Sequence, residues 1–177
     1  MNQLLAYTPN LLKSFNLQAD LKSQSLDQLV LTFEVENKND DVDFKTAPVQ
    51  VGVDKIKRQD ELWKQTCFEF FLNPVGEKKY YEFNFGLNPV WNCYVFDSYR
   101  NPQPPKASTD FEILKFSWTG TRLEVSLQNR SPYKKFNIGI TAVIKDKKDQ
   151  THYFALKHAG EKPDFHLQNS FILQRGS

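Results

Sequence analysis

One carboxylate lies in the middle of an apolar run: Glu69, in the segment CFEFFL at residues 67–72. Successive side chains of a strand point to opposite faces, so Phe68 and Phe70 would share one face and Glu69 would lie on the other. Burying a charged carboxylate without a partner costs on the order of several kcal/mol. Ligands, metals and cross-strand cations are the usual partners, so Glu69 is the first candidate for a ligand-binding residue.

The segment YYEFNF at residues 80–85 alternates in the same way, with aromatic residues on one face and Glu82 and Asn84 on the other. A hairpin between it and the first segment would bring Glu69 near Glu82 or Asn84. Arg100, at the end of the next apolar run, could pair with one of the carboxylates. Such a polar face suits a polyol, although the same side chains could instead form a network that holds the strands together.

Two further groups could complete a site. Trp63 precedes the first segment in a loop-like context, DELWKQ, which favours partial exposure, and an exposed indole can stack on the C–H face of a sugar ring. Residues 155–166 form a polar, turn-rich loop between two predicted strands. Its side chains could contact an anionic or hydroxylated ligand, or one another; they include Lys157, His158, Lys162, Asp164 and His166.

Signatures of common enzymes and of bound cofactors are missing. The sequence contains no GxSxG, GxGxxG, phosphate loop or HExxH, and Cys67 and Cys93 have no CxxC spacing, so we expect free buried thiols and neither metal nor cofactor. An enzyme would need an acid/base pair. Glu69 with Glu82, or Asp164 with His166, are the arrangements that could supply one, and catalysis therefore stays open.

Length and charge limit the remaining classes. A chain of 177 residues fits one domain, which we place at residues 1–177. Lys+Arg 23 against Asp+Glu 21 give a net charge of +2, which argues against a nucleic-acid binder. No segment is long and apolar enough for a membrane span, and the N-terminus does not look like a secretion signal. The expected location is therefore cytoplasmic; the oligomeric state stays open.

The elements that must position these residues are strands, because hydrophobic residues recur with a period of two. Clear alternation occurs at residues 29–36, 122–127 and 136–145, the last with a short hairpin partner at 152–157 across the charged turn KDKK. Further strands are expected near 13–17, 111–118 and 170–173, and residues 55–63 could form a helical turn or an ordered loop. Many short strands separated by tight turns predict an all-β fold, a single antiparallel β-sandwich of jelly-roll or immunoglobulin-like topology.

The segments LWKQTCFEFFL, YYEFNFG, TRLEVSL and FNIGITAVIKDKKDQTHYFALKH resemble, in this order, the DOMON-like group related to carbohydrate-binding module family 9. The resemblance spans residues 29–173 and implies a β-sandwich that binds sugars between two tryptophans without catalysis. Trp63 matches the first tryptophan and Glu69 the strand carboxylate. In place of the second tryptophan the chain offers Phe165 or His166, and Asn84 lies where the family has an arginine. The methionine ligand of haem-binding DOMON domains has no counterpart.

These observations predict a non-catalytic domain that binds a carbohydrate or a similar polar small molecule. The predicted ligand-binding residues are Trp63, Glu69, Asn84, Arg100, Lys157, His158, Asp164 and His166. Two alternatives remain: a protein-interaction module that uses an exposed sheet edge or aromatic face, and a glycoside-processing enzyme.

Overall fold

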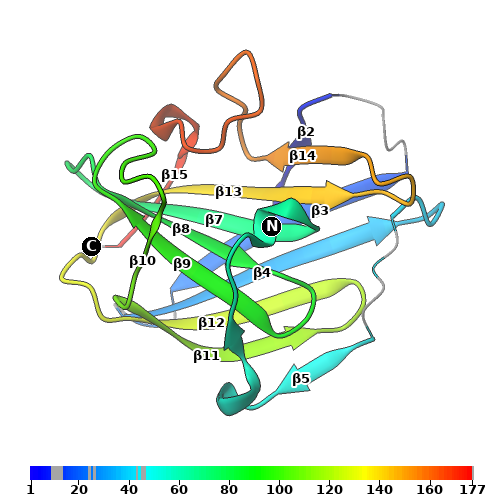
Figure 1. Ribbon diagram of the computed structural model, residues 1–177, viewed down its shortest axis with the longest axis horizontal. Coiled ribbons are helices and arrows are strands. Elements are labelled where there is room, and N and C mark those ends of the chain that lie inside the picture. Colours follow the sequence, from blue (N-terminus) through cyan, green and yellow to red (C-terminus); the bar gives the residue numbers. More distant parts are fainter. Residues whose placement is uncertain (9–13, 24, 26, 43, 45–46, 177) are drawn as a thin grey trace.

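The computed structural model describes residues 1–177 except 9–13, 24, 26, 43, 45–46 and 177, and it forms two β-sheets packed face to face (Figure 1). The first sheet, sheet A, has the order β1-β3-β4-β12-β11-β5. Its strands are β1 (Asn2–Gln3), β3 (Phe15–Ser23), β4 (Gln28–Asn37), β12 (Arg122–Asn129), β11 (Phe111–Trp118) and β5 (Val49–Val51).

The second sheet, sheet B, has the order β10-β9-β8-β7-β13-β14-β2, with β15 paired to β13 and β6 paired to β9. Its strands are β10 (Lys106–Ala107), β9 (Val90–Phe96), β8 (Tyr80–Phe85), β7 (Cys67–Pro74), β13 (Phe136–Lys145), β14 (Thr151–Ala155), β2 (Leu5–Ala6), β15 (Leu173–Arg175) and β6 (Lys57–Arg58). Strand pairing in the described part of the chain is antiparallel except between β6 and β9. The all-β antiparallel sandwich predicted from the sequence is therefore confirmed.

In the described part of the chain, helical structure is confined to three single 3₁₀ turns, η1 (Val53–Lys55), η2 (Leu62–Lys64) and η3 (Gln168–Ser170). The first two lie at the ends of the irregular segment for which the sequence predicts a helical turn or an ordered loop. Among the described residues, no helix has the length and apolar character to cross a membrane.

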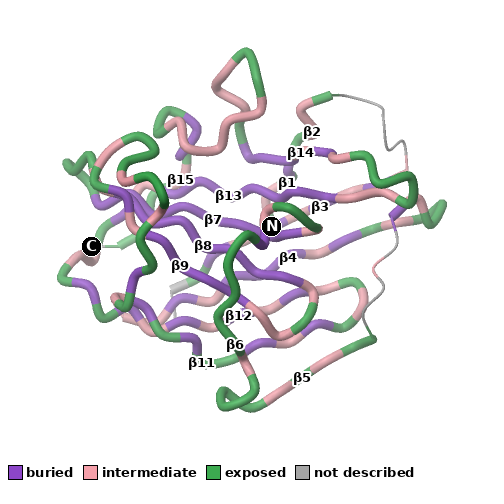
Figure 2. The backbone as a smooth tube through the Cα atoms, viewed as in Figure 1, coloured by how far each residue is buried: buried purple, intermediate pink, exposed green. Residues whose placement is uncertain are grey.

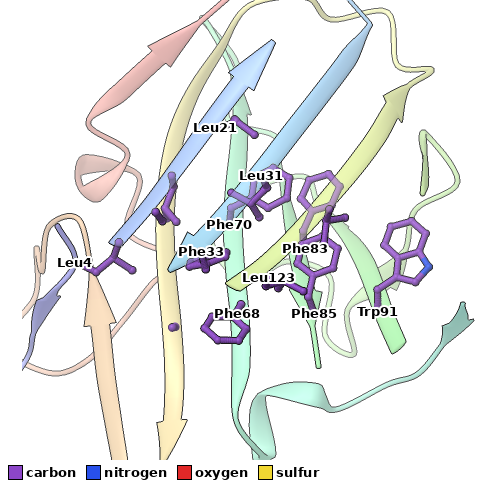
Figure 3. Close-up of a cluster of buried hydrophobic side chains, with 14 of the residues drawn as sticks. Leu4, Leu21, Leu31, Phe33, Phe68, Phe70, Phe83, Phe85, Trp91 and Leu123 are labelled. Atoms are coloured by element: carbon purple, nitrogen blue, oxygen red, sulfur yellow. The ribbon is translucent and has the colours of Figure 1, made fainter. Parts of the chain in front are cut away.

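The core lies between the sheets and is rich in aromatic rings (Figure 3). Phe33 of β4 meets Phe68 of β7 across the sandwich, with ring centroids 4.8 Å apart, while Phe70 and Phe83 stack at 4.1 Å within sheet B. Trp118 and Trp91 are both buried. This burial removes apolar surface from water, which is the main force that holds the two layers together.

Sheet B is buried on both faces. Alternation with a period of two usually indicates a strand with one exposed face, so burial of the second face does not follow from the sequence pattern. All eight residues of β7 are buried, and the middle of the sheet is buried in Figure 2. Three segments border its outer face: η2, the connection at residues 97–105, and the connection at residues 156–171. The polar residues of this face are therefore held away from bulk water.

The sequence places most strands correctly and one incorrectly. The predicted strands at 29–36, 122–127 and 136–145 correspond to β4, β12 and β13, and 111–118 coincides with β11. Residues 170–173 are not a continuous strand, because the Ser170 amide and hydroxyl both bond to the Leu167 carbonyl in a turn (2.9 and 2.6 Å) and β15 begins only at Leu173. The predicted strand at 13–17 begins at Phe15; Lys13 lies outside the described residues.

Candidate ligand-binding site

A cavity of about 410 Å³ lies over Glu69 on the outer face of sheet B. Its volume is within the range of small-molecule sites, roughly 300–1,000 Å³. The residues that line it come from η2, five strands and the two covering connections: Trp63, Glu69, Phe71, Glu82, Phe96, Arg100, Gln103, Pro105, Val143, Tyr153, Pro163, Phe165 and His166.

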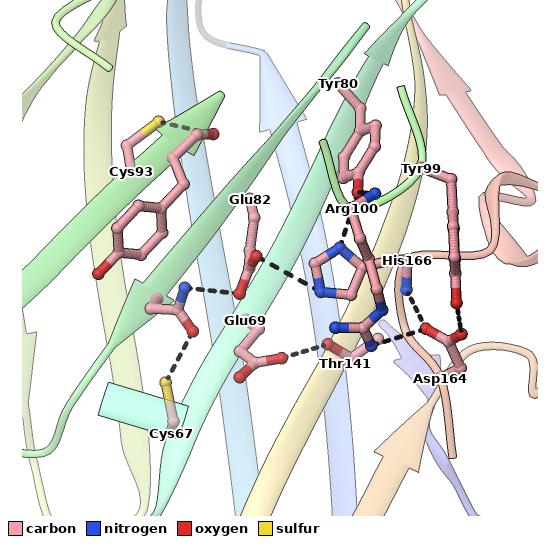
Figure 4. A network of polar contacts seen from close by, with 12 residues as sticks. Cys67, Glu69, Tyr80, Glu82, Cys93, Tyr99, Arg100, Thr141, Asp164 and His166 are labelled. Atoms are coloured by element: carbon pink, nitrogen blue, oxygen red, sulfur yellow. Dashed lines mark hydrogen bonds and ion pairs between the residues drawn. The ribbon is translucent and has the colours of Figure 1, made fainter. Parts of the chain in front are cut away.

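Glu69 lies on the floor of this cavity with 2% of its surface exposed. The Thr141 hydroxyl, on the adjacent strand β13, donates to Glu69 Oε2 at 3.2 Å (Figure 4). The Cys67 thiol, two residues earlier on the same face, is a neutral neighbour of Glu69. Among the described residues, Glu69 makes no ion pair.

Glu82 is the second buried acid, on the neighbouring strand β8. The register pairs Glu69 with Asn84 and Phe71 with Glu82, so the two acids are diagonal neighbours on one face. The hairpin predicted from the alternation is therefore present, with the polar faces together. Asn84 is fully buried behind the cavity, where it donates to Glu82 Oε1 at 2.9 Å and accepts from the Cys67 thiol at 3.4 Å.

His166 enters the site from the second connection and packs edge-on against Phe71, Tyr80 and Phe96. The Arg100 main-chain amide donates to the Tyr80 hydroxyl at 3.0 Å, and a hydrogen bond of 2.8 Å joins that hydroxyl to His166 Nδ1. The other ring nitrogen, Nε2, faces Glu82 Oε2 at 3.7 Å. That distance allows electrostatic attraction but is too long for a hydrogen bond.

Arg100 does not pair with Glu69 or Glu82, contrary to the prediction that it could. Its guanidinium instead donates to Asp164 Oδ1 at 3.0 Å, and the Tyr99 hydroxyl donates to Asp164 Oδ2 at 2.6 Å (Figure 4). Asp164 also accepts the His166 main-chain amide at 3.0 Å. These bonds join the two covering connections, so Asp164 positions Arg100 and His166 and does not itself line the cavity.

Aromatic rings form much of the cavity wall. Trp63 is half-buried and contacts Tyr94 edge-on at 5.8 Å, while Tyr153 and Phe165 meet edge-on at 5.9 Å. Partial exposure of Trp63 agrees with its loop context. Phe165, which the family resemblance suggests as a replacement for the second tryptophan, lines the same cavity as Trp63.

Burial dominates the acid–base properties of the site. Burial, and then the nearby charge of Glu82, raise the pKa of Glu69 well above its usual value. Burial also raises the pKa of Glu82 to about 7, against the opposing effects of the Asn84 hydrogen bond and the Arg100 charge. Burial and the Arg100 charge lower the pKa of His166 to about 4, so this ring is neutral at pH 7.

The pKa of Asp164 is shifted down, unlike those of Glu69 and Glu82. Burial alone would raise its pKa, but the hydrogen bonds from Tyr99, the His166 amide and Arg100 outweigh burial and lower it. Asp164 therefore carries its charge at neutral pH and fixes the guanidinium. Its carboxylate contacts the His166 main chain rather than the ring, so these two residues do not form the acid/base pair that the sequence left open.

Four predicted residues lie outside the cavity lining: Asn84, Asp164, Lys157 and His158. Lys157 is exposed, and His158 bonds through Nε2 to the Leu5 carbonyl at 2.8 Å and packs on Tyr7, which holds the connection against the N-terminal segment. Conversely, Glu82, Phe71 and Tyr153 line the cavity although they were not among the predicted ligand-binding residues. For Glu82 and Phe71 the strand alternation already indicated the face.

A larger hollow of about 580 Å³ lies at the end of sheet B, between η2, the turn before β9 and the β13–β14 hairpin. No aromatic ring lines it, and its charged side chains come from turns. We therefore place the candidate site at the smaller cavity. Cys67 and Cys93 are free and buried, as the sequence predicts. Within the described part of the chain, no group of three or more His, Cys, Asp or Glu residues could hold a metal ion.

A solved structure has the same fold. The crystal structure of a "putative carbohydrate-binding protein" from Bacteroides uniformis matches with a TM-score of 0.64 and 13% sequence identity, over 98% of this chain and 84% of that one. At this identity the likeness establishes the fold and does not establish a shared site. No protein-family model matches the sequence, and no curated protein matches it either.

Proposed function

We propose that this protein binds a carbohydrate or a similar polar small molecule in the cavity over Glu69, without catalysis. One observation carries the proposal: buried carboxyl groups line a cavity whose walls include Trp63, Tyr153 and Phe165. Aromatic rings offer flat surfaces for the C–H face of a sugar, and carboxyl groups hydrogen-bond hydroxyls. The fold shared with a "putative carbohydrate-binding protein" supports the same class of ligand.

The test is a panel of monosaccharides and short oligosaccharides, screened by thermal shift and then by isothermal titration calorimetry. At least one sugar should bind. Trp63→Ala should weaken its binding tenfold or more because the stacking surface is lost, and Trp63→Phe should retain part of the affinity. Glu69→Gln keeps the shape of the side chain and removes the carboxylate, and it should abolish detectable binding.

Glu112→Gln is the matched control, because Glu112 lies on sheet A in an exposed ion pair with Arg130. Its affinity should equal that of the wild type. If Trp63→Ala and Glu69→Gln both bind the sugar as the wild type does, the ligand sits elsewhere and the proposed site is wrong.

A glycoside-processing enzyme is a second candidate, favoured by Glu69 and Glu82 lining the same cavity. Glycosidases place two carboxyl groups on either side of the scissile bond. Here both acids belong to neighbouring strands of one sheet face, below the ligand, which supports binding better than hydrolysis. Incubation of the bound oligosaccharide with the protein, followed by chromatography, should show it intact; release of shorter products that Glu82→Gln prevents would support the enzyme instead.

A further inference from the structure

The cavity floor holds two carboxyl groups that make no ion pair with a Lys or Arg side chain among the described residues. Glu69 has no ion pair among the described residues, and the nearest basic group to Glu82 is the Nε2 atom of His166 at 3.7 Å, on a ring that is neutral at pH 7. Arg100 is the cation at the rim, but Asp164 already binds its guanidinium at 3.0 Å. A buried carboxylate without a counter-charge is costly, so these acids favour a ligand that supplies one.

The walls of the same cavity also favour a cation. Five aromatic side chains line it: Trp63, Phe71, Phe96, Tyr153 and Phe165. Ring faces attract a positive charge, and the attraction grows when the cation is removed from water, as it would be above a floor that is almost fully buried. Rings and carboxyl groups together thus provide the two kinds of contact that an ammonium group makes.

An acidic ligand would meet the reverse conditions. Its carboxylate would approach Glu69 and Glu82, and the guanidinium that could attract it is engaged by Asp164. A neutral sugar would be tolerated, with its hydroxyls bonded to carboxyl groups that stay partly protonated. The charge of the ligand should therefore rank affinities in the order amine, neutral, acid.

We propose that the cavity takes a sugar with a free, protonated amino group, the ammonium lying between Glu69 and Glu82 and the ring against Trp63. This inference rests on the proposed function and specifies its ligand. Binding of the cation pulls both carboxyl groups to their charged form, so protons leave the protein as the ligand enters. The proton balance is complete: each carboxyl that ionises releases one proton to the buffer.

The experiment compares four monosaccharides of one ring type by calorimetry at pH 6: glucosamine, N-acetylglucosamine, glucose and glucuronate. Glucosamine should bind at least tenfold more tightly than glucose, and glucuronate should bind most weakly. Acetylation removes the charge while keeping the nitrogen, so N-acetylglucosamine should lose the advantage. Titrations in two buffers of different ionisation enthalpy should show proton release for glucosamine and none for glucose.

Glu82→Gln tests whether the Glu82 carboxyl group contributes to binding of the ammonium group. Glucosamine affinity should fall about tenfold while glucose affinity stays within about twofold, with circular dichroism confirming the fold; Glu112→Gln should change neither. Equal or tighter binding of glucose or N-acetylglucosamine would overturn the amine preference and leave the proposed function standing. Failure of these four and of the whole sugar panel to bind would overturn both.

Discussion

At the scale of single residues, the acids on the outer face of sheet B are hydrogen-bonded to neutral groups. The Thr141 hydroxyl donates to Glu69, and the Asn84 amide donates to Glu82. Such donors satisfy hydrogen bonds without supplying charge, so burial raises the pKa of both acids. Burial lowers the pKa of the neighbouring His166.

The opposite shifts of Glu82 and His166 predict a compensated pH dependence of stability. Glu82 binds its proton more tightly folded (pKa about 7) than unfolded (4.5), so its contribution is complete below pH 4.5 and is lost as pH rises through 7. His166 binds its proton less tightly folded (about 4) than unfolded (6.5), so its contribution is complete above pH 6.5 and is lost as pH falls through 4. Between pH 4.5 and 6.5 the two slopes cancel.

Single substitutions should separate these slopes. Relative to the wild type, the stability of Glu82→Gln should rise with pH by about 1 kcal/mol per unit between pH 4.5 and 6.5, and that of His166→Asn should fall by a similar amount. Urea unfolding at several pH values measures both, with Glu112→Gln as the surface control. Parallel profiles for wild type and both variants would mean that neither group is shifted.

At the scale of elements, the cover of sheet B depends on one close approach between β13 and the chain after η3. A Cβ atom at Gly139 would lie 2.5 Å from Phe171 Cδ1, so that ring occupies the space which a side chain would need. Phe171 stacks on Phe71 with centroids 5.4 Å apart, and Phe71 lines the cavity. The glycine therefore lets the covering chain pack directly on the sheet.

Gly139→Ala should destabilise the protein by about 1–3 kcal/mol through overpacking, although alanine usually suits a strand interior better than glycine. Displacement of Phe171 should also weaken sugar binding by moving Phe71. The matched test is the same substitution in a Phe171→Ala background, where the space is free and the added cost should largely vanish. Equal costs in the two backgrounds, from denaturant unfolding, would contradict this account of the contact.

Strand alternation was sufficient to predict which residues of each strand share a face, because it depends only on local geometry. It placed Glu69, Glu82 and Asn84 together correctly. It could not predict that Arg100 would bond to Asp164, 64 residues away, because that contact depends on how two long connections fold over the sheet. The same cause explains why Lys157, which lies in the second connection, was included although it is exposed.

At the scale of the whole molecule, strand β7 joins the candidate site to the core. Phe68 points inward to meet Phe33 of sheet A, and the next residue, Glu69, points outward into the cavity. Because successive side chains of a strand point to opposite faces, β7 contributes both to the core and to the candidate site. We propose that the two sheets unfold as one unit, consistent with the single domain expected from the sequence.

Phe33→Ala tests whether the two sheets unfold together. It leaves a void opposite Phe68 and should cost about 3–5 kcal/mol, with Phe33→Leu as a milder change. Amide hydrogen exchange should lose protection in β4 and β12 of sheet A and in β7 and β13 of sheet B by the same free energy, because opening either sheet exposes the shared core. Sugar affinity, measured at a temperature where the variant is still folded, should be unchanged because Phe33 does not line the cavity. Loss of protection confined to sheet A would mean that sheet B, and with it the site, is stable without its partner layer.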